Sequence, residues 1–192
     1  MEFLETARLY LRSWEAEDAD VLRSLSGAGV LPLLGMPPHS SEEECRSLSA
    51  ALAAGDADFA LGDKESERII GIVSLPCRHP AGVEPKLPGR SLTFALLPEF
   101  RGRGLMDEAL TEMIRHAFED IGLGMLWSYW PEGGAATKRL LEAHAFRPAL
   151  ERPETLPGGG VCTLHHMTLT WETWVDRREE ERIFELLLSS YY

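Results

Sequence analysis

The residues best suited to bind a ligand lie in a short loop, Arg101-Gly102-Arg103-Gly104. Glycine has no side chain, so Gly102 and Gly104 let the backbone approach a ligand closely and adopt unusual dihedral angles. The hydrophobic pattern predicts a helix from Gly104, and the first N–H groups of a helix bind phosphate because they lack partners within the helix. Arg101 and Arg103 add positive charge. The loop therefore predicts a pyrophosphate site, with a plain tight turn as the alternative.

Two common phosphate-binding motifs do not fit this loop. A P-loop would continue with Gly-Lys-Ser or Gly-Lys-Thr, and neither follows. The dinucleotide fingerprint needs a third glycine and an early strand that leads into it. What favours a binding site over a plain turn is the position of the loop, after the fourth predicted strand and two N-terminal helices.

Hydrophobic periodicity predicts the elements that position this loop. Strands are expected at about 7–12, 59–61, 68–75, 91–97, 125–130, 146–151 and 161–170. Helices are expected at about 17–25, 40–54, 104–121 and 135–145. Segments rich in Gly and Pro, at 27–38 and 78–89, are expected to be loops. This order of strands and helices indicates an α/β protein.

Two of the predicted helices carry the clearest local signals. Ser41 and Glu44 have the spacing of a capping box at the start of the second helix. The helix at 104–121 has apolar residues at three- and four-residue spacing, as in a helix that packs on a sheet. These residues are Met106, Leu110, Met113, Ile114, Ala117, Phe118 and Ile121.

The loop and its flanks resemble a known family. The run Arg101-Gly102-Arg103-Gly104-Leu105-Met106 is similar to the acetyl-CoA signature of GNAT acetyltransferases, Arg/Gln-x-x-Gly-x-Gly/Ala. The segments Glu5 to Arg12 and Leu97 to Gly104 look like the branch that contains ribosomal-protein N-terminal acetyltransferases. Residues Arg139 to Phe146, at the end of the helix predicted at 135–145, stand where that branch has another motif. The resemblance runs from about Leu4 to Thr170.

This resemblance implies a GNAT fold, with a mixed central sheet of six to seven strands that is splayed at the cofactor site and flanked by about four helices. Residues 1–192 would form one acetyltransferase domain, with 172–192 as a C-terminal helical extension. The co-substrate would be acetyl-CoA and no metal is implied. The acceptor would be a primary amine, of a protein N-terminus or of a small molecule, which attacks the thioester directly.

The resemblance also assigns roles in binding acetyl-CoA. The backbone of Leu96 and Leu97, beside a bulge that splays two strands, would pair with the pantetheine arm. The amides from Arg101 to Met106, Leu105 included, would hold the pyrophosphate. Thr137, where the family usually has serine, would lie near the thiol.

Three positions depart from the family pattern. Met106 replaces the usual glycine or alanine, Gly134 replaces an asparagine that contacts the cofactor, and Ser91 replaces a glutamate that serves as base in many relatives. These departures motivate an alternative, a non-catalytic or weakly catalytic acyl-CoA-binding or interaction module that kept the fold.

Few residues are candidates for proton transfer. Glu132, just after a predicted strand, is the first candidate for the base that removes the proton of the amine, directly or through water. Tyr129 or Ser128 would donate a proton to the leaving thiolate, and Ser91 would relay one. For each of them the alternative is a surface or packing role.

The overall charge excludes one class of partner. The chain has 31 acidic and 19 basic residues, a formal net charge of -12. Non-specific binding to nucleic acid needs a basic surface, so we expect no nucleic-acid partner. A negative field would attract a cationic amine, although an acidic composition also serves solubility alone.

The remaining composition indicates a cytoplasmic protein without a metal site. No stretch approaches the roughly 18 consecutive apolar residues that span a bilayer, and Met1 to Glu5 lack the basic segment of a secretory signal. The cysteines show no metal-binding spacing with the histidines. His165 and His166 are neighbours in a predicted strand, so their side chains point to opposite faces and cannot share a metal.

The C-terminal segment, 172–192, is predicted to be a helix with a charged run followed by an apolar end at 183–188. The apolar end would pack on its own domain or form a homodimer contact, because a bare apolar patch is a liability. A purely structural interaction protein that uses this segment is a further alternative.

Overall fold

The computed structural model describes residues 3–38, 41–84 and 86–189. The predicted helix start near Ser40 and the last three residues of the C-terminal segment lie outside these ranges. Met1 and Glu2, which belong to the segment compared with a secretory signal, also lie outside these ranges. The same holds for residue 85 of the predicted loop at 78–89.

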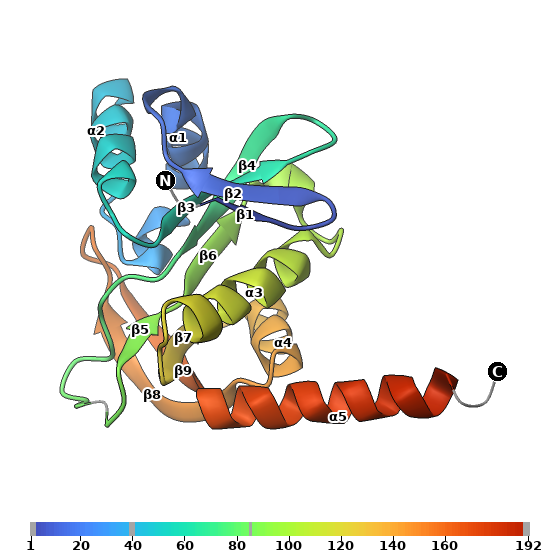
Figure 1. The fold of residues 1–192 in the computed structure, drawn as a ribbon. Coiled ribbons are helices and arrows are strands. Elements are labelled where there is room, and N and C mark those ends of the chain that lie inside the picture. The colour runs from blue at the N-terminus through green and yellow to red at the C-terminus, as the bar shows by residue number, and fades with distance from the viewer. Residues whose placement is uncertain (1–2, 39–40, 85, 190–192) are drawn as a thin grey trace.

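The strands form two sheets (Figure 1). The first sheet is antiparallel and has the order β1-β2-β3-β4-β6. Its strands are β1 (Leu4–Glu5), β2 (Leu9–Ser13), β3 (Asp58–Asp63), β4 (Arg68–Ser74) and β6 (Thr93–Leu96). The second sheet has the order β5-β7-β9-β8, in which β5 and β7 are parallel. Its strands are β5 (Gly89–Ser91), β7 (Met125–Pro131), β8 (Arg147–Thr155) and β9 (Val161–Thr170).

The prediction of a single strand at 91–97 is wrong. The chain leaves the second sheet after Ser91 and enters the first at Thr93, so the segment divides into β5 and β6. The N–H of Leu92 donates to the carbonyl of Trp127 at 2.6 Å, whereas the N–H of Leu97 donates to the carbonyl of Ile70 at 2.9 Å. The described chain therefore has a five-stranded and a four-stranded sheet that diverge at Leu92, in place of one sheet of six to seven strands. The predicted splay is confirmed.

Within the described ranges, five α-helices surround the sheets. They are α1 (Ala19–Gly27), α2 (Glu42–Ala53), α3 (Leu105–Arg115), α4 (Ala135–Ala143) and α5 (Trp171–Ser189). The predicted capping box at α2 is confirmed, because the Ser41 side chain accepts from the N–H of Glu44 and the Glu44 side chain bonds the N–H of Ser41. The predicted helix at 104–121 changes after α3 into a π-helical turn, His116–Asp120.

The helices lie on defined faces of the first sheet (Figure 1). Helices α1 and α2 contact β4 and β3, and α3 contacts β2 and β4. Phe59 of β3 meets the His116 ring edge-on at 5.9 Å, which shows that its side chain lies on the face covered by α3. A short 3-10 helix, Leu31–Leu34 (η2), lies within the predicted loop at 27–38 and contacts β6.

Strand β8 runs beyond its predicted end near 151. Proline lacks an N–H group, so Pro148 and Pro153 break the expected strand pattern. The position of β8 at the edge of its sheet tolerates both prolines, because an edge strand has one side without a partner strand.

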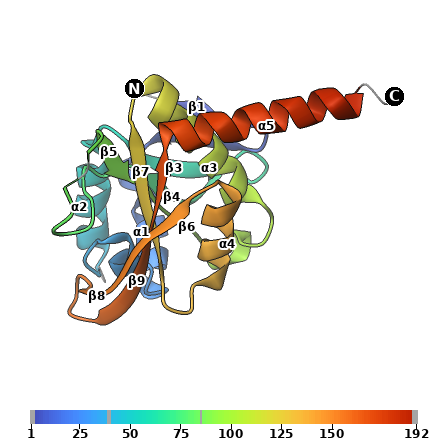
Figure 2. The ribbon, with the colours of Figure 1, turned by 90° about the horizontal axis from the view of Figure 1, so that it is seen from below.

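Helix α5 begins against the domain and then extends away from it (Figures 1 and 2). Trp171 and Trp174 pack against Phe118, with ring centroids 5.9 and 5.3 Å apart. The apolar residues at the other end are exposed, and they include Ile183 at 57% and Phe184 at 62%. Packing of this apolar end on its own domain, one of the two predicted outcomes, does not occur.

Candidate active site

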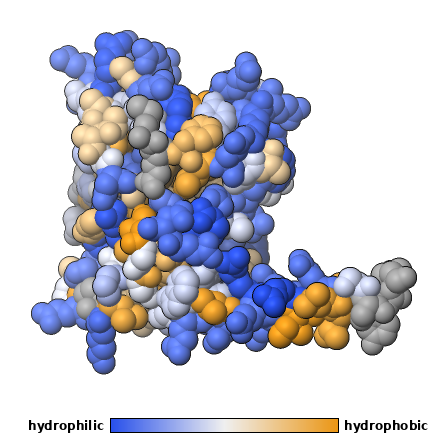
Figure 3. All heavy atoms as spheres, viewed as in Figure 1, coloured by the Kyte–Doolittle hydropathy of each residue, from blue (hydrophilic) through white to orange (hydrophobic). Residues whose placement is uncertain are grey.

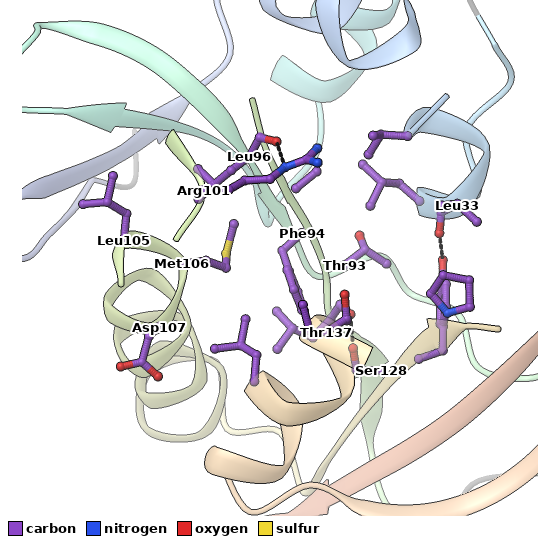
Figure 4. A pocket seen from close by; sticks show the side chains of 18 of the residues that line it. Leu33, Thr93, Phe94, Leu96, Arg101, Leu105, Met106, Asp107, Ser128 and Thr137 are labelled. Atoms are coloured by element: carbon purple, nitrogen blue, oxygen red, sulfur yellow. Dashed lines mark hydrogen bonds between the residues drawn. The ribbon is translucent and has the colours of Figure 1, made fainter. Parts of the chain in front are cut away.

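A cavity of about 530 Å³ opens where β6 and β7 diverge. It is lined by β6, β7, η2, the start of α4 and the loop that leads into α3. Figure 4 shows Arg101, Leu105 and Met106 on one side of the cavity and Leu33 of η2 on the other. The sequence-predicted loop therefore lies at one end of a substantial hollow.

The loop before α3 has the backbone of a phosphate cradle. Gly102 and Gly104 have φ angles of +74° and +73°, in the left-handed region where a side chain causes strain. Gly104 is the N-cap of α3 and has no side chain to cap the first N–H groups of the helix. Those N–H groups are the ones a helix offers to an anion.

Hydrogen bonds from Arg8, far away in sequence, and from within the loop hold it in place. Arg8 donates to the Arg103 carbonyl at 3.0 Å, and its Nε pairs with Glu108 at 2.6 Å. Arg103 donates to the Glu99 carbonyl at 2.8 Å and its guanidinium lies over the Phe100 ring. The Arg103 guanidinium thus supports the loop, whereas Arg101 lines the cavity.

Strand β6 offers backbone groups to the cavity. Antiparallel partners alternate, so the bond from Leu97 to Ile70 turns the backbone groups of Leu97 toward β4 and those of Phe94 and Leu96 toward the gap. The Leu96 carbonyl accepts from Nε of Arg101 at 3.1 Å. The sequence prediction chose Leu96 and Leu97 and missed Phe94. Backbone groups alternate in direction along a strand, so Phe94 could have been identified once it was known that the chain changes sheet at Leu92.

The cavity passes from one face of the first sheet to the other. Residues directly opposite each other in a sheet share a face. Phe94 pairs with Val73, which pairs with Phe59, so Phe94 lies on the face covered by α3. Its neighbour Thr93 lies on the opposite face, toward η2. The gap between β6 and β7 is therefore a passage that joins the cradle to the η2 side.

Comparison with protein families identifies residues 8–147 as an acetyltransferase (GNAT) domain. This segment is well over half of the chain and contains the cradle, β6, β7 and α4. The chain belongs to the GNAT acetyltransferase family. No curated protein matches the sequence.

Solved structures confirm the GNAT fold. An acetyltransferase (GNAT family) from Bacillus anthracis has a TM-score of 0.73 at 13% identity, over 89% of this chain and 99% of that one. The spermidine N-acetyltransferase of Vibrio cholerae, in complex with CoA and spermine, has a TM-score of 0.71 at 17% identity, over 88% and 99%. The ribosomal-protein-S5-alanine acetyltransferase of Vibrio fischeri has a TM-score of 0.69 at 18% identity, over 91% and 99%.

Met106, which stands where the family usually has glycine or alanine, does not close the cradle. Met106 lies in the first turn of α3 and its side chain lines the cavity (Figure 4). The cavity keeps its volume of about 530 Å³ with this side chain in place. Gly134 is the N-cap of α4, where a Cβ would lie 2.8 Å from the Pro131 carbonyl. The tight turn before α4 therefore leaves no room there for the asparagine of other GNAT members.

Of the predicted proton-transfer residues, Tyr129 lies in the cavity. Its hydroxyl donates to the Leu33 carbonyl at 2.7 Å, and burial raises its pKa. Ser128 also lines the cavity and donates to the Leu92 carbonyl at 2.9 Å. Thr137, predicted to lie near the thiol, lines the cavity from the first turn of α4. These three residues surround the passage between the two sheets.

Ser91 and Glu132 lie apart from this group. Ser91 is buried and its hydroxyl donates to the Arg78 carbonyl at 2.7 Å, outside the lining of the cavity. The Glu132 side chain is 72% exposed and its Oε2 lies 3.0 Å from Nε2 of His165. The structure thus does not bring these two residues together with Tyr129. Their assignments as relay and base stay predictions.

A row of polar residues that sequence reasoning missed leads away from the cavity. Thr93 pairs with Ser74, and Ser74 pairs with Asp58, so all three share the η2 face of the first sheet. Burial raises the pKa of Asp58, and the Ser74 hydroxyl and nearby arginines oppose this effect only in part. Each of these residues is a polar residue at the end of a strand. Only the register of the strands shows that the three lie side by side.

Proposed function

We propose that this GNAT protein transfers an acetyl group from acetyl-CoA to a primary amine. The observation that carries the proposal is the passage through the first sheet, which joins the loop before α3, with its positive-φ glycines and uncapped helix start, to the side lined by η2. The amides from Arg101 to Met106 would hold the pyrophosphate, and the backbone of Phe94 and Leu96 would bind the pantetheine arm. Bound acetyl-CoA supplies an activated acetyl thioester.

The residues around the passage fit this transfer. A neutral amine entering from the η2 side forms the new C–N bond while the C–S bond of the thioester breaks. Tyr129 stays protonated at neutral pH because its raised pKa lies above the ordinary value of about 10. It is therefore a proton donor for the leaving sulfur. The proton of the amine leaves to water or to a base, for which Glu132 remains the predicted candidate and Ser91 the predicted relay.

The test is isothermal titration of the purified protein with acetyl-CoA. Gly104→Asp places a carboxylate in the cradle and is expected to weaken binding at least tenfold, about 1.4 kcal/mol, through repulsion and loss of close approach. Gly122→Asp is the matched control, because Gly122 also has a positive φ, of +78°, and open space where a Cβ would lie. Gly122 lies away from the cavity, so the Gly122→Asp variant should bind acetyl-CoA normally.

The outcomes separate two of the functions that the sequence left open, the acetyltransferase and the non-catalytic module. Tight binding to the unaltered protein that Gly104→Asp removes supports the cofactor site, and release of CoA with amines supports catalysis. Binding without CoA release on a broad amine panel supports the non-catalytic module. Absence of binding to the unaltered protein overturns the proposal.

We also infer that a second copy of the chain covers the apolar end of α5, which is the homodimer contact. Ile183, Phe184 and Leu188 are exposed there, by 57%, 62% and 50% (Figure 3). A net charge of -12 disfavours an anionic membrane surface as the partner. Among the described residues, no helix has the length and hydropathy needed to cross a membrane. The proposed location is the cytoplasm, where the free cysteines stay reduced.

A further inference from the structure

The half of the cavity opposite the cradle is an apolar chamber. One wall is the 3-10 helix η2 together with its N-cap residue, and it contributes Val30, Leu33 and Leu34. Leu34 is buried and Val30 packs against the core, so this wall is fixed. Figure 4 shows Leu33 across the cavity from Arg101.

The opposite wall of the chamber is equally uncharged. Leu92, Thr93 and Tyr129 form it, at the point where the two sheets diverge. The Tyr129 hydroxyl donates a hydrogen bond to the Leu33 carbonyl, which joins the two walls. The Thr93 and Ser128 hydroxyls are further polar groups beside this wall, and both are uncharged.

The charged residues that line the cavity lie at its other end. Among the described lining residues they are Arg101 and Asp107, and Figure 4 shows both beside the cradle. Asp107 lies in the first turn of α3, where its carboxylate is 3.0 Å from Nε2 of His144. Among the described residues that line the cavity, the chamber therefore has no carboxylate to pair with a positively charged group.

The surroundings of the chamber reinforce this selectivity. Arg78 donates to the carbonyls of Leu34 and Gly35, so a positive charge lies behind η2. The acidic first turn of α2, Glu42 to Glu44, is exposed and lies outside the cavity lining. Two further acids near the chamber, Asp58 and Glu154, also lie outside the residues that line the cavity.

We propose that the acceptor is a primary amine carried on an apolar body, without a second charged amine. This inference rests on the proposed acetyl transfer and names its substrate class. The reacting nitrogen enters neutral and loses its proton as the C–N bond forms, and the CoA sulfur gains a proton as the C–S bond breaks. A second ammonium group would stay charged in an apolar chamber without a partner, and burial of an unpaired charge is strongly unfavourable.

The experiment compares hexylamine with 1,6-diaminohexane, which differ only in the second amine. Release of CoA from acetyl-CoA is measured at several amine concentrations, and kcat/KM is corrected for the fraction of neutral amine. We expect kcat/KM to be at least tenfold higher for hexylamine. Spermidine is included as a longer polyamine and is expected to be as poor as the diamine.

Leu33→Glu introduces a carboxylate into the chamber at a half-buried position. We expect it to raise the preference for the diamine over hexylamine about tenfold. Leu33→Gln is the control of the same size without charge, and it should keep the preference of the unaltered protein. Titration with acetyl-CoA checks that both variants fold and bind the co-substrate, because Leu33 lies across the cavity from the cradle.

The outcomes distinguish this inference from the function on which it rests. If the unaltered protein binds acetyl-CoA but acetylates the diamine or spermidine as well as hexylamine, the apolar acceptor class is wrong and the acetyltransferase function stands. If it binds acetyl-CoA and acetylates none of these amines, the acceptor class is also wrong. If it does not bind acetyl-CoA, both proposals fail.

Discussion

Two neighbouring hydroxyl side chains line the cavity where the two sheets diverge. Ser128 and Tyr129 both donate to main-chain carbonyls, of Leu92 and Leu33. These bonds fix the side chains across the gap and satisfy carbonyls that no neighbouring strand reaches. Tyr129 combines this structural bond with a raised pKa and a place on the cavity wall. It is the residue for which a structural and a catalytic role must be separated.

Tyr129→Phe separates these roles. Removal of the hydroxyl leaves the Leu33 carbonyl without its donor, so we expect a loss of about 1–3 kcal/mol in unfolding free energy. If Tyr129 also protonates the leaving sulfur, kcat should fall at least about 100-fold with a nearly unchanged Kd for acetyl-CoA. Urea unfolding and steady-state kinetics measure the two effects. A loss of stability without a change in kcat would assign Tyr129 a structural role alone.

At the scale of elements, the position of α3 decides the position of the cradle. Glu108 in its first turn accepts hydrogen bonds from the Thr6 hydroxyl and from the N–H and Nε of Arg8. Arg8 in turn donates to the Arg103 carbonyl of the loop. One carboxylate, that of Glu108, therefore joins the N-terminal strands to the helix that follows the cradle. Glu108 and Arg8 are 100 residues apart in sequence.

Stability should depend on the ionisation of Glu108. Burial favours a higher pKa for Glu108, but the bonds from Thr6 and Arg8 outweigh it and lower the pKa below 4.5. The folded state thus favours the carboxylate, so its stabilising effect is complete above pH 4.5 and is lost as the pH falls through the lowered pKa. We expect Glu108→Gln to cost about 1.5–3 kcal/mol at pH 7.

The cost of Glu108→Gln should shrink below pH 4.5, because the unaltered protein then loses the same charge. Urea unfolding at pH 7 and at pH 3.5 measures this change. Glu43→Gln, on the exposed first turn of α2, is the control and should have little effect at either pH. A cost for Glu108→Gln that is equal at both pH values would contradict an ionised anchor.

At the scale of the whole molecule, α5 is the element that the domain does not cover. Its first turns are held by Trp171 and Trp174, and its end carries exposed Ile183, Phe184 and Leu188. A stable interface buries about 800 Å² per partner, so a dimer would use the side of the helix together with its apolar end. Figure 2 shows that the helix extends clear of both sheets, which leaves this surface accessible to a second copy.

Mass in solution tests this contact. Phe184→Glu with Leu188→Glu places two charges one turn apart on the apolar end, where they would be buried and unpaired in a dimer. We expect the unaltered protein to have twice the mass of one chain by light scattering and the double variant to be monomeric. Glu180→Gln on the same helix should leave the dimer intact. A monomeric unaltered protein would refute the dimer.

The sequence by itself determined the cradle, the main helices and the family. These features depend on local spacing: glycines that adopt positive φ, an N-cap before an amphipathic stripe, and a Ser41 to Glu44 capping box. Each pattern is formed by residues close together in sequence, so it can be recognised without knowledge of the rest of the chain.

The tertiary structure alone decided which side chains and backbone groups face the cavity. The division of 91–97 at Leu92 follows from hydrogen bonds to Trp127 and Ile70, residues of two different sheets, and it turns Phe94 toward the gap in place of Leu97. The same register places Ser91 outside the cavity. Strand pairing and the divergence of sheets depend on partners distant in sequence, and a shift by one residue reverses every side chain. Local patterns do not contain that information.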